Sequence, residues 1–168
     1  MLICCVIALL FCITGNAKVP YIPKIINYSV SDYKAGNQNW AVSQGPGGKM
    51  YIGNNRGLLV FDGIHWDLVK LPNNLGVRAL YISKDGRIYV GSFEEFGYFE
   101  MDDENDLIYH SLSSSEMNVY LNNDEFWTIN EYKGEIYFQS FRSFFIYDGE
   151  KVRKGVSDLS PLYIFTLD

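Results

Sequence analysis

Cysteine is absent from most of this sequence. All three cysteines, Cys4, Cys5 and Cys12, lie near the amino terminus. A disulfide framework, a thiolate metal site and a cysteine nucleophile are therefore excluded from the rest of the chain. The only histidines are His65 and His110, and neither has a cysteine or carboxylate at the spacing of a metal-ligand pair. Both are expected to be solvent-facing strand residues.

The sequence also has no basic stripe. Lys and Arg number 14 against 20 Asp and Glu, which gives a net charge of -6, and the two signs are interspersed. This segment is therefore not expected to hold a nucleic-acid backbone. The hydrophobic content of 48% is ample for a packed core. Thirteen Tyr and eleven Phe favour strands over helices.

Motifs for catalysis and for metal or phosphate binding are missing. The glycine-rich stretch 45–48 is not followed by Gly-Lys-Ser/Thr, so it is not a phosphate loop. No serine lies in a nucleophile elbow. The acidic run 102–106 lacks the central glycine and terminal glutamate of a calcium loop, and is expected to be a solvated hairpin. The sequence therefore predicts no enzyme, no metal and no cofactor.

A long apolar run occurs only at the amino terminus. Residues 2–13 are uninterruptedly apolar, and small residues precede a potential cleavage point after Ala17. The run is too short to span a bilayer as a helix but fits the core of a secretory signal. We therefore expect residues 1–17 to be a signal peptide and the protein to be exported to the periplasm. A buried strand or helix is the alternative.

An internal repeat dominates the remainder. The segment 48–53 reads Gly-Lys-Met-Tyr-Ile-Gly, and similar segments return at 86–91 and 134–139. A strand and an Asp-Gly turn at 57–63 recur at 144–149. Self-similarity with a period of about 40–50 residues is typical of propellers and solenoids. Four short strands separated by glycine-rich turns form one antiparallel propeller blade.

The pattern predicts an all-β fold, a partial β-propeller of about three four-stranded antiparallel blades plus the first strand of a fourth. Residues 18–36 are expected to form an extended lead-in that could become an outer strand. The propeller then occupies 37–168, with these expected parts: blades at 37–71, 75–112 and 126–154, and the start of another at 161–168. Propellers close with about 4–8 blades. We therefore interpret the chain as a truncated piece of a longer one.

The stretch 40–153 resembles the two-component-regulator propeller repeat, with tyrosine where that family often has tryptophan. Segments 36–42 and 90–99 look especially like one subgroup. Its members are envelope-spanning regulators with a periplasmic propeller, a triple-tyrosine module, one membrane helix and a helix-turn-helix domain. A sister group carries a histidine kinase instead.

The resemblance implies a sensor fragment that binds an extracytoplasmic ligand such as an oligosaccharide. It also implies contact with the remaining blades and a homodimer in intact relatives, with membrane contact only through a downstream segment.

Blade geometry predicts one recognition face. Turns alternate between the two ends of an antiparallel blade, so the loop after each second strand shares a face with the connections between blades. This face is rich in amides, charges and aromatics, which suits sugars or peptides. The candidate ligand-binding residues are Asn54, Arg56, Glu94, Glu95 and Arg142. The alternative is that Asn and Gly are simply good turn residues.

Two other functions remain open from the sequence. A secreted propeller enzyme of the lyase or glycosidase class would need a convergent catalytic centre near the axis. A protein-interaction propeller would need no small ligand.

Overall fold

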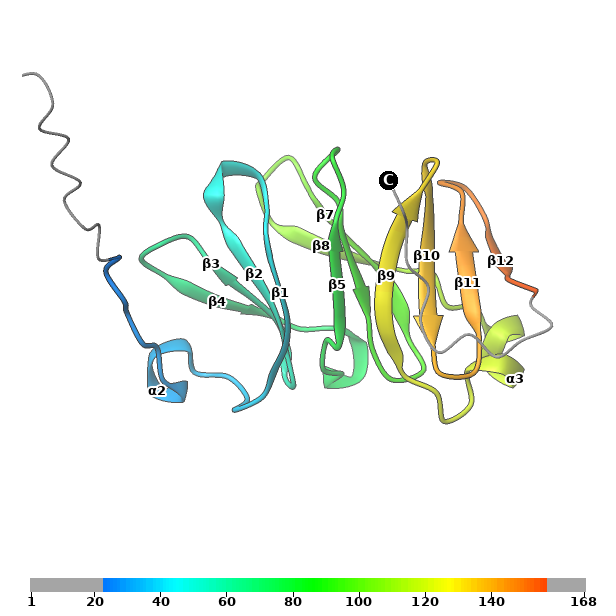
Figure 1. Cartoon of the computed structure of the whole chain (residues 1–168), viewed down its shortest axis with the longest axis horizontal. Coiled ribbons are helices and arrows are strands. Elements are labelled where there is room, and N and C mark those ends of the chain that lie inside the picture. The colour runs from blue at the N-terminus through cyan, green and yellow to red at the C-terminus, as the bar shows by residue number, and fades with distance from the viewer. Residues whose placement is uncertain (1–22, 157–168) are drawn as a thin grey trace, which may run out of the picture.

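The computed structural model describes residues 23–156, which form three four-stranded antiparallel sheets. Within each sheet the strands pair in sequence order, as in the blades of a propeller. Figure 1 shows the sheets side by side in chain order. The expected fold class, a partial β-propeller, is confirmed. The expected signal peptide, 1–17, and the expected strand at 161–168 lie outside the described residues.

The three sheets are called blades 1 to 3. Blade 1 contains β1 (Asn39–Gln44), β2 (Met50–Asn54), β3 (Gly57–Phe61) and β4 (Trp66–Val69). Blade 2 contains β5 (Ala79–Ile82), β6 (Ile88–Gly91), β7 (Phe96–Met101) and β8 (Leu107–Ser111). Blade 3 contains β9 (Phe126–Tyr132), β10 (Glu135–Ser140), β11 (Phe144–Tyr147) and β12 (Val152–Lys154). The first strands β1, β5 and β9 contact each other in turn and are the inner strands.

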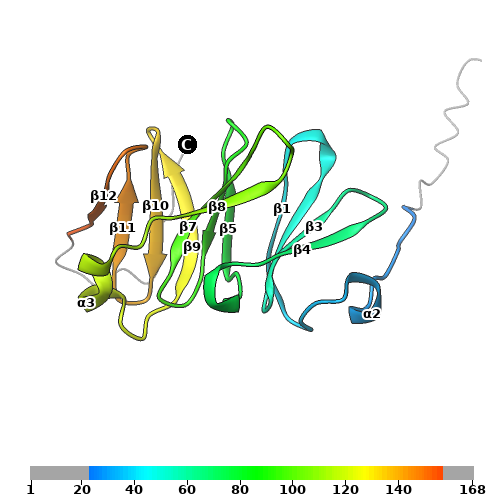
Figure 2. The ribbon, with the colours of Figure 1, turned by 180° about the vertical axis from the view of Figure 1, so that it is seen from behind.

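The loops gather at two opposite edges. The first and last hairpins of each blade lie at one edge, which we call the hairpin edge (Figure 1). The middle turns and the segments between blades lie at the other, which we call the connection edge. Figure 2 shows the short helices α2 (Val30–Tyr33) and α3 (Asn118–Leu121) at the connection edge from behind. The segments between blades contain the following short helices: η2 (Pro72–Asn74), η3 (Ser115–Met117) and α3 (Asn118–Leu121).

The lead-in differs from the expected extended segment or outer strand. It contains a single helical turn, α2 (Val30–Tyr33), whose start is held by a 2.6 Å hydrogen bond from the Ser29 N–H to the Asp32 carboxylate. The rings of Tyr28 and Tyr33 then pack against Trp66 on β4. The turn forms because this capping bond satisfies an otherwise free N–H, and because the rings cover apolar surface on blade 1.

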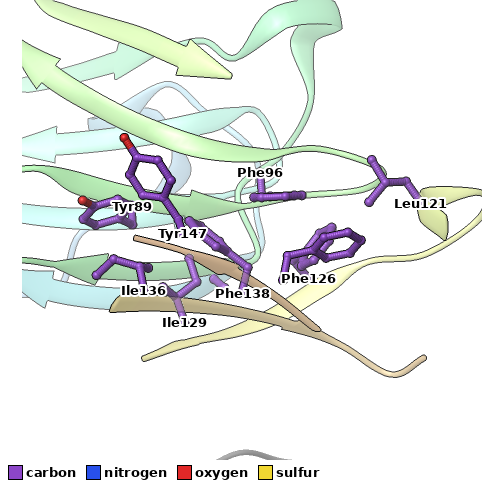
Figure 3. Close-up of a cluster of buried hydrophobic side chains, with 10 residues drawn as sticks. Tyr89, Phe96, Leu121, Phe126, Ile129, Ile136, Phe138 and Tyr147 are labelled. Carbon is purple, nitrogen blue, oxygen red and sulfur yellow. The ribbon is translucent and has the colours of Figure 1, made fainter. Parts of the chain in front are cut away.

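Two apolar cores join the blades. Between blades 1 and 2, Tyr51 and Leu58 pack with Ile88, Val90 and Phe99. Figure 3 shows the second core, which lies between blades 2 and 3 and is mainly aromatic. Its fully buried rings are those of Phe96, Phe126, Phe138 and Phe145. Burial of one such side chain stabilises a fold by about 1.5–3 kcal/mol, so these rings hold the blades together.

Close backbone approach between blades depends on glycine. A Cβ atom on Gly91 would lie 2.7 Å from the Cβ of Phe126, and one on Gly53 would lie 3.0 Å from Val77. In both cases the contact is to the segment that enters the next blade. Blade 3 has the buried Gln139 at the corresponding position, so this close approach is a property of the first two blades.

Candidate ligand-binding surface at the connection edge

The inner strands present one equivalent residue each at the connection edge. Cross-strand pairing aligns Ala41 with Gly53, Ala79 with Gly91, and Thr128 with Gln139. The residues immediately before Ala41, Ala79 and Thr128 therefore occupy the same place in each blade. They are Trp40, Arg78 and Trp127. Because inner strands surround the axis of a propeller, these side chains mark the axial end of the connection edge.

Arg78 organises this group. Its guanidinium carbon lies 4.5 Å from the centre of a Trp40 ring, which is cation–π distance. The same guanidinium donates to Asn55 Oδ1, and its Nε lies 3.5 Å from Glu125 Oε1. Trp40 Nε1 also donates to Asn55 Oδ1, at 2.6 Å. The residues just before the first strand of each blade are called its entry segment. Contacts of this kind connect all three blades, and we call the group the axial cluster: Trp40, Asn55, Arg78, Glu125, Trp127 and Phe141.

Trp127 has one buried polar group without a hydrogen-bond partner in the described part of the chain. Its ring centre lies 5.6 Å from Trp40 and 5.8 Å from the exposed ring of Phe141. Its indole Nε1 is buried and has no hydrogen-bond partner in the part of the chain that the structure describes. An unpaired buried donor costs about 1–3 kcal/mol, so native structures rarely keep one without a role. The axial cluster therefore combines aromatic faces with an unpaired donor that is covered by the surrounding side chains.

Asn54 belongs to the scaffold rather than to this surface. Its side chain is fully buried. The amide nitrogen donates to Gly36 O and to Asn39 Oδ1, both at 2.7 Å, while Oδ1 accepts from the Gly36 N–H at 2.9 Å. The sequence-based candidate Asn54 is therefore occupied in holding the entry segment of blade 1, and its amide is not presented to solvent.

Equivalent buried polar residues follow in the other blades. Ser92 Oγ donates to Gly76 O at 2.5 Å, and Ser140 Oγ donates to the Asp124 carboxylate. Each of these residues therefore binds the entry segment of its own blade through its side chain. The carbonyl oxygens of Asn54 and Ser92 also accept N–H groups from the next entry segment, those of Val77 at 2.9 Å and Phe126 at 3.0 Å.

Two of the sequence-based candidates lie close together. Glu94 Oε1 accepts the Asn123 N–H at 2.5 Å, and Arg142 Nη1 lies 3.5 Å from Asn122 O. Both side chains are exposed and flank the segment that enters blade 3. An open pocket of about 600 Å³ is lined by Glu94, Val119, Leu121 and Asn122.

The remaining two candidates lie apart. Arg56 is exposed in the β2–β3 turn of blade 1, beside Gly36. The Glu95 carboxylate accepts hydrogen bonds from Tyr109 at 2.8 Å and from Ser111 and Ser113 at 2.7 Å each. Burial, with the nearby Glu95, raises the pKa of Tyr109. Glu95 therefore anchors the outer strand β8, and its carboxylate is saturated by hydroxyl donors.

The axial cluster was not among the sequence-based candidates. Its residue types differ between blades, so the tyrosine repeat does not reveal their equivalence. A signal was available, because each of these residues stands at the start of a predicted inner strand. Residues 23–156 contain no group of three or more His, Cys, Asp or Glu that could hold a metal ion. Within the same residues no helix is long and apolar enough to cross a membrane.

The sheet topology and the inner-strand cluster define this protein as a partial β-propeller. No protein-family model and no curated protein matches the sequence. Among solved structures, the chain is similar to the extracellular domain of the putative one component system BT4673 from B. thetaiotaomicron. The TM-score is 0.64 at 12% identity, over 80% of this chain and 19% of that one.

Two further solved structures share the fold. The extracellular domain of the putative hybrid two component system BT3049 from B. thetaiotaomicron matches with a TM-score of 0.57 at 22% identity, over 83% of this chain and 19% of that one. A catalytically inactive virginiamycin B lyase from Staphylococcus aureus, with quinupristin, matches with a TM-score of 0.57 at 16% identity, over 83% of this chain and 47% of that one. The chain spans about a fifth of the length of the extracellular domains. At these identities the likeness establishes the fold.

Proposed function

We propose that this chain is part of the extracytoplasmic sensor propeller of a membrane-spanning regulator, and that it binds a ligand at the connection edge without catalysing a reaction. The fold shared with extracellular domains of one- and two-component systems supports the sensor role. Export by a signal peptide at residues 1–17 belongs to the same proposal. So does a cytoplasmic output, either a helix-turn-helix domain or a histidine kinase, in the intact protein.

The axial cluster is the observation that carries ligand binding. Trp40 is 40% exposed and Phe141 is 50% exposed, so both offer ring faces to solvent. Arg78 and Asn55 supply polar groups beside them, and Glu94 and Arg142 contact the segment that enters blade 3 at the same edge. A site with flat apolar faces and a few fixed polar groups is typical of small-molecule recognition.

An oligosaccharide fits this chemistry best. Sugar rings have an apolar face that packs on aromatic rings, and hydroxyls that donate and accept hydrogen bonds. The Glu125 carboxylate is an acceptor suited to hydroxyls, and the unpaired Trp127 Nε1 would reach a sugar oxygen only if the side chains that cover it moved. The exposed Arg56 and Arg142 extend the surface away from the axis.

Tryptophan fluorescence tests the proposal. The full chain would be titrated with soluble linear hexasaccharides of glucose, xylose and galactose. We expect at least one to change the emission, and W40F to remove most of that change. The matched control is W66F, because Trp66 packs between Tyr28, Tyr33 and Phe61 on blade 1 and should leave the response intact.

A second variant protects the test from misfolding. Arg142 is exposed, so R142Q should fold normally and weaken binding. The proposal fails if no hexasaccharide changes the emission. It also fails if W40F and R142Q both bind as tightly as the parent protein.

A lyase is the second candidate, because the propeller of virginiamycin B lyase matches over most of this chain. Mass spectrometry after incubation with quinupristin separates the two functions. We expect the compound to remain intact. Conversion to a ring-opened product would overturn the non-enzymatic assignment.

A further inference from the structure

A pocket between blades 1 and 2 is lined by residues of their first hairpins. These hairpins lie at the hairpin edge, opposite the connection edge (Figure 1). The volume of the pocket is about 670 Å³, which is large enough for a monosaccharide. The walls come from the first hairpins of the two blades and from the end of β7. The residues that carry its chemistry are Lys49, Tyr51, Asp85, Arg87, Glu100 and Met101.

Lys49 and Arg87 are equivalent residues, since each follows the glycine of the first hairpin in its blade. Glu135 occupies this position in blade 3, and Arg153 neutralises it across the sheet at 2.6 Å. The Lys49 ammonium has no ion-pair or hydrogen-bond partner among residues 23–156. The charged side chain at this position is therefore neutralised in blade 3, whereas in blade 1 it is available to a ligand.

Arg87 is only loosely paired. Its guanidinium lies 3.7 Å from Glu100 and 3.8 Å from Asp85, distances beyond those of charge-assisted hydrogen bonds. Asp85 is already engaged in the hairpin, where it accepts from the Ser83 hydroxyl and the Arg87 N–H. The guanidinium also stands 5.2 Å over the Tyr98 ring, which fixes its position. The Tyr89 hydroxyl is a further hydrogen-bond partner of the guanidinium. Because a guanidinium has five N–H donors, Arg87 keeps donors for another anion.

The pocket contains two cations, Lys49 and Arg87, and two carboxylates, Asp85 and Glu100, so its formal charges balance. Of these four charged groups, only the Lys49 ammonium has no ion-pair partner in the described part of the chain. Lys49 is free and Arg87 is held in place, whereas Asp85 is committed to its turn. Tyr51 contributes a hydroxyl with no hydrogen-bond partner in the described part of the chain, and Met101 adds an apolar wall. We propose that this pocket is a second binding site, for a small hydroxylated ligand that carries a carboxylate, of the uronic acid class. Lys49 and Arg87 bind the carboxylate, Tyr51 and Glu100 bind hydroxyls, and Met101 packs on the ring.

Calorimetric titration of the full chain with D-glucuronate tests this site, and D-glucose serves as the neutral comparison. We expect glucuronate to bind at least about tenfold more tightly than glucose, since a charge-assisted contact is worth at least that factor. Added salt should weaken glucuronate binding, because Lys49 is exposed. Equal affinities for the two sugars, or no binding of glucuronate, would overturn the proposal.

Charge-removing variants locate the site. K49Q and R87Q should each weaken glucuronate binding about tenfold. The matched control is K133Q, because Lys133 lies on the first hairpin of blade 3, where its ammonium stands over Tyr132. K49Q alters an exposed side chain and should fold normally, so it remains informative if R87Q does not fold. Unchanged affinity in K49Q, or an equal loss in K133Q, would exclude this pocket.

This site is independent of the axial cluster. W40F should leave glucuronate binding unchanged, and K49Q should leave the fluorescence response to hexasaccharides unchanged. Failure of one proposal is therefore distinguishable from failure of the other.

Discussion

The hydroxyl of Tyr81 donates a 2.6 Å hydrogen bond to Glu131 Oε2, which joins the inner strand of blade 2 to the inner strand of blade 3. The two residues are far apart in sequence, so the bond forms only when both blades are in place. Burial, together with this hydrogen bond and the charge of Glu131, raises the pKa of Tyr81 to about 12. Ionisation of Tyr81 at alkaline pH therefore weakens the contact between blades 2 and 3.

The first prediction concerns this pair. The folded pKa of Tyr81 lies above its ordinary value of 10.0, so its contribution to stability is complete below pH 10.0 and is lost as pH rises toward about 12. Y81F should lower the free energy of unfolding at neutral pH by about 1 kcal/mol. Urea unfolding at several pH values checks both statements. If the parent and Y81F lose stability identically between neutral and alkaline pH, the assigned role is wrong.

The second prediction concerns Asn54. N54A removes the hydrogen bonds to Gly36 and Asn39 and leaves the partly buried N–H and carbonyl groups of Gly36 unpaired. We expect a loss of about 2–3 kcal/mol in the free energy of unfolding. The control is N122A at the same edge, because Asn122 is exposed and should change stability by less than about 0.5 kcal/mol. Equal stabilities of the two variants would contradict the scaffold role of Asn54.

The third prediction concerns acid pH at the β3–β4 hairpin. The Asp62 carboxylate accepts the backbone N–H groups of His65 at 2.6 Å and Ile64 at 2.7 Å. These bonds lower the pKa of Asp62 to about 2, from an ordinary value of 3.8. The stabilisation is present above pH 3.8 and is lost as pH falls through about 2.

NMR measures this transition directly. The amide resonances of Ile64 and His65 should shift with a midpoint near pH 2, and D62A should show no such midpoint. Asp148 makes the same contacts to Glu150 and Lys151 in blade 3, and its pKa is also lowered by them. A midpoint near the ordinary value for Asp62 would show that the turn bonds do not stabilise the ionised carboxyl.

The blade pattern was readable from the sequence because packing and turn chemistry repeat. Tyr51 and Tyr89 are buried in successive blade cores, and Gly53 and Gly91 sit where the next entry segment approaches most closely. Their identities are fixed by packing requirements that blades 1 and 2 share. α2 was not predicted, because its turn depends on packing against Trp66, which is distant in sequence.

The site was less predictable for a different reason. Asn54 was selected as a polar turn residue, yet the entry segment at Gly36 buries it. Arg78 was not selected, although it links Trp40, Asn55 and Glu125. Whether a polar side chain faces solvent or another blade is decided by contacts between blades, and these contacts do not follow the spacing within one blade.

The paired use of Asn54 and Ser92 has a mechanical consequence. Each residue fixes the entry of its own blade with its side chain and the entry of the following blade with its carbonyl oxygen. Adjacent blades are therefore coupled as nearest neighbours along a line, and local opening at one junction loosens the sheets on both sides. Loss of the middle blade would abolish two junctions, whereas loss of a terminal blade would abolish only one.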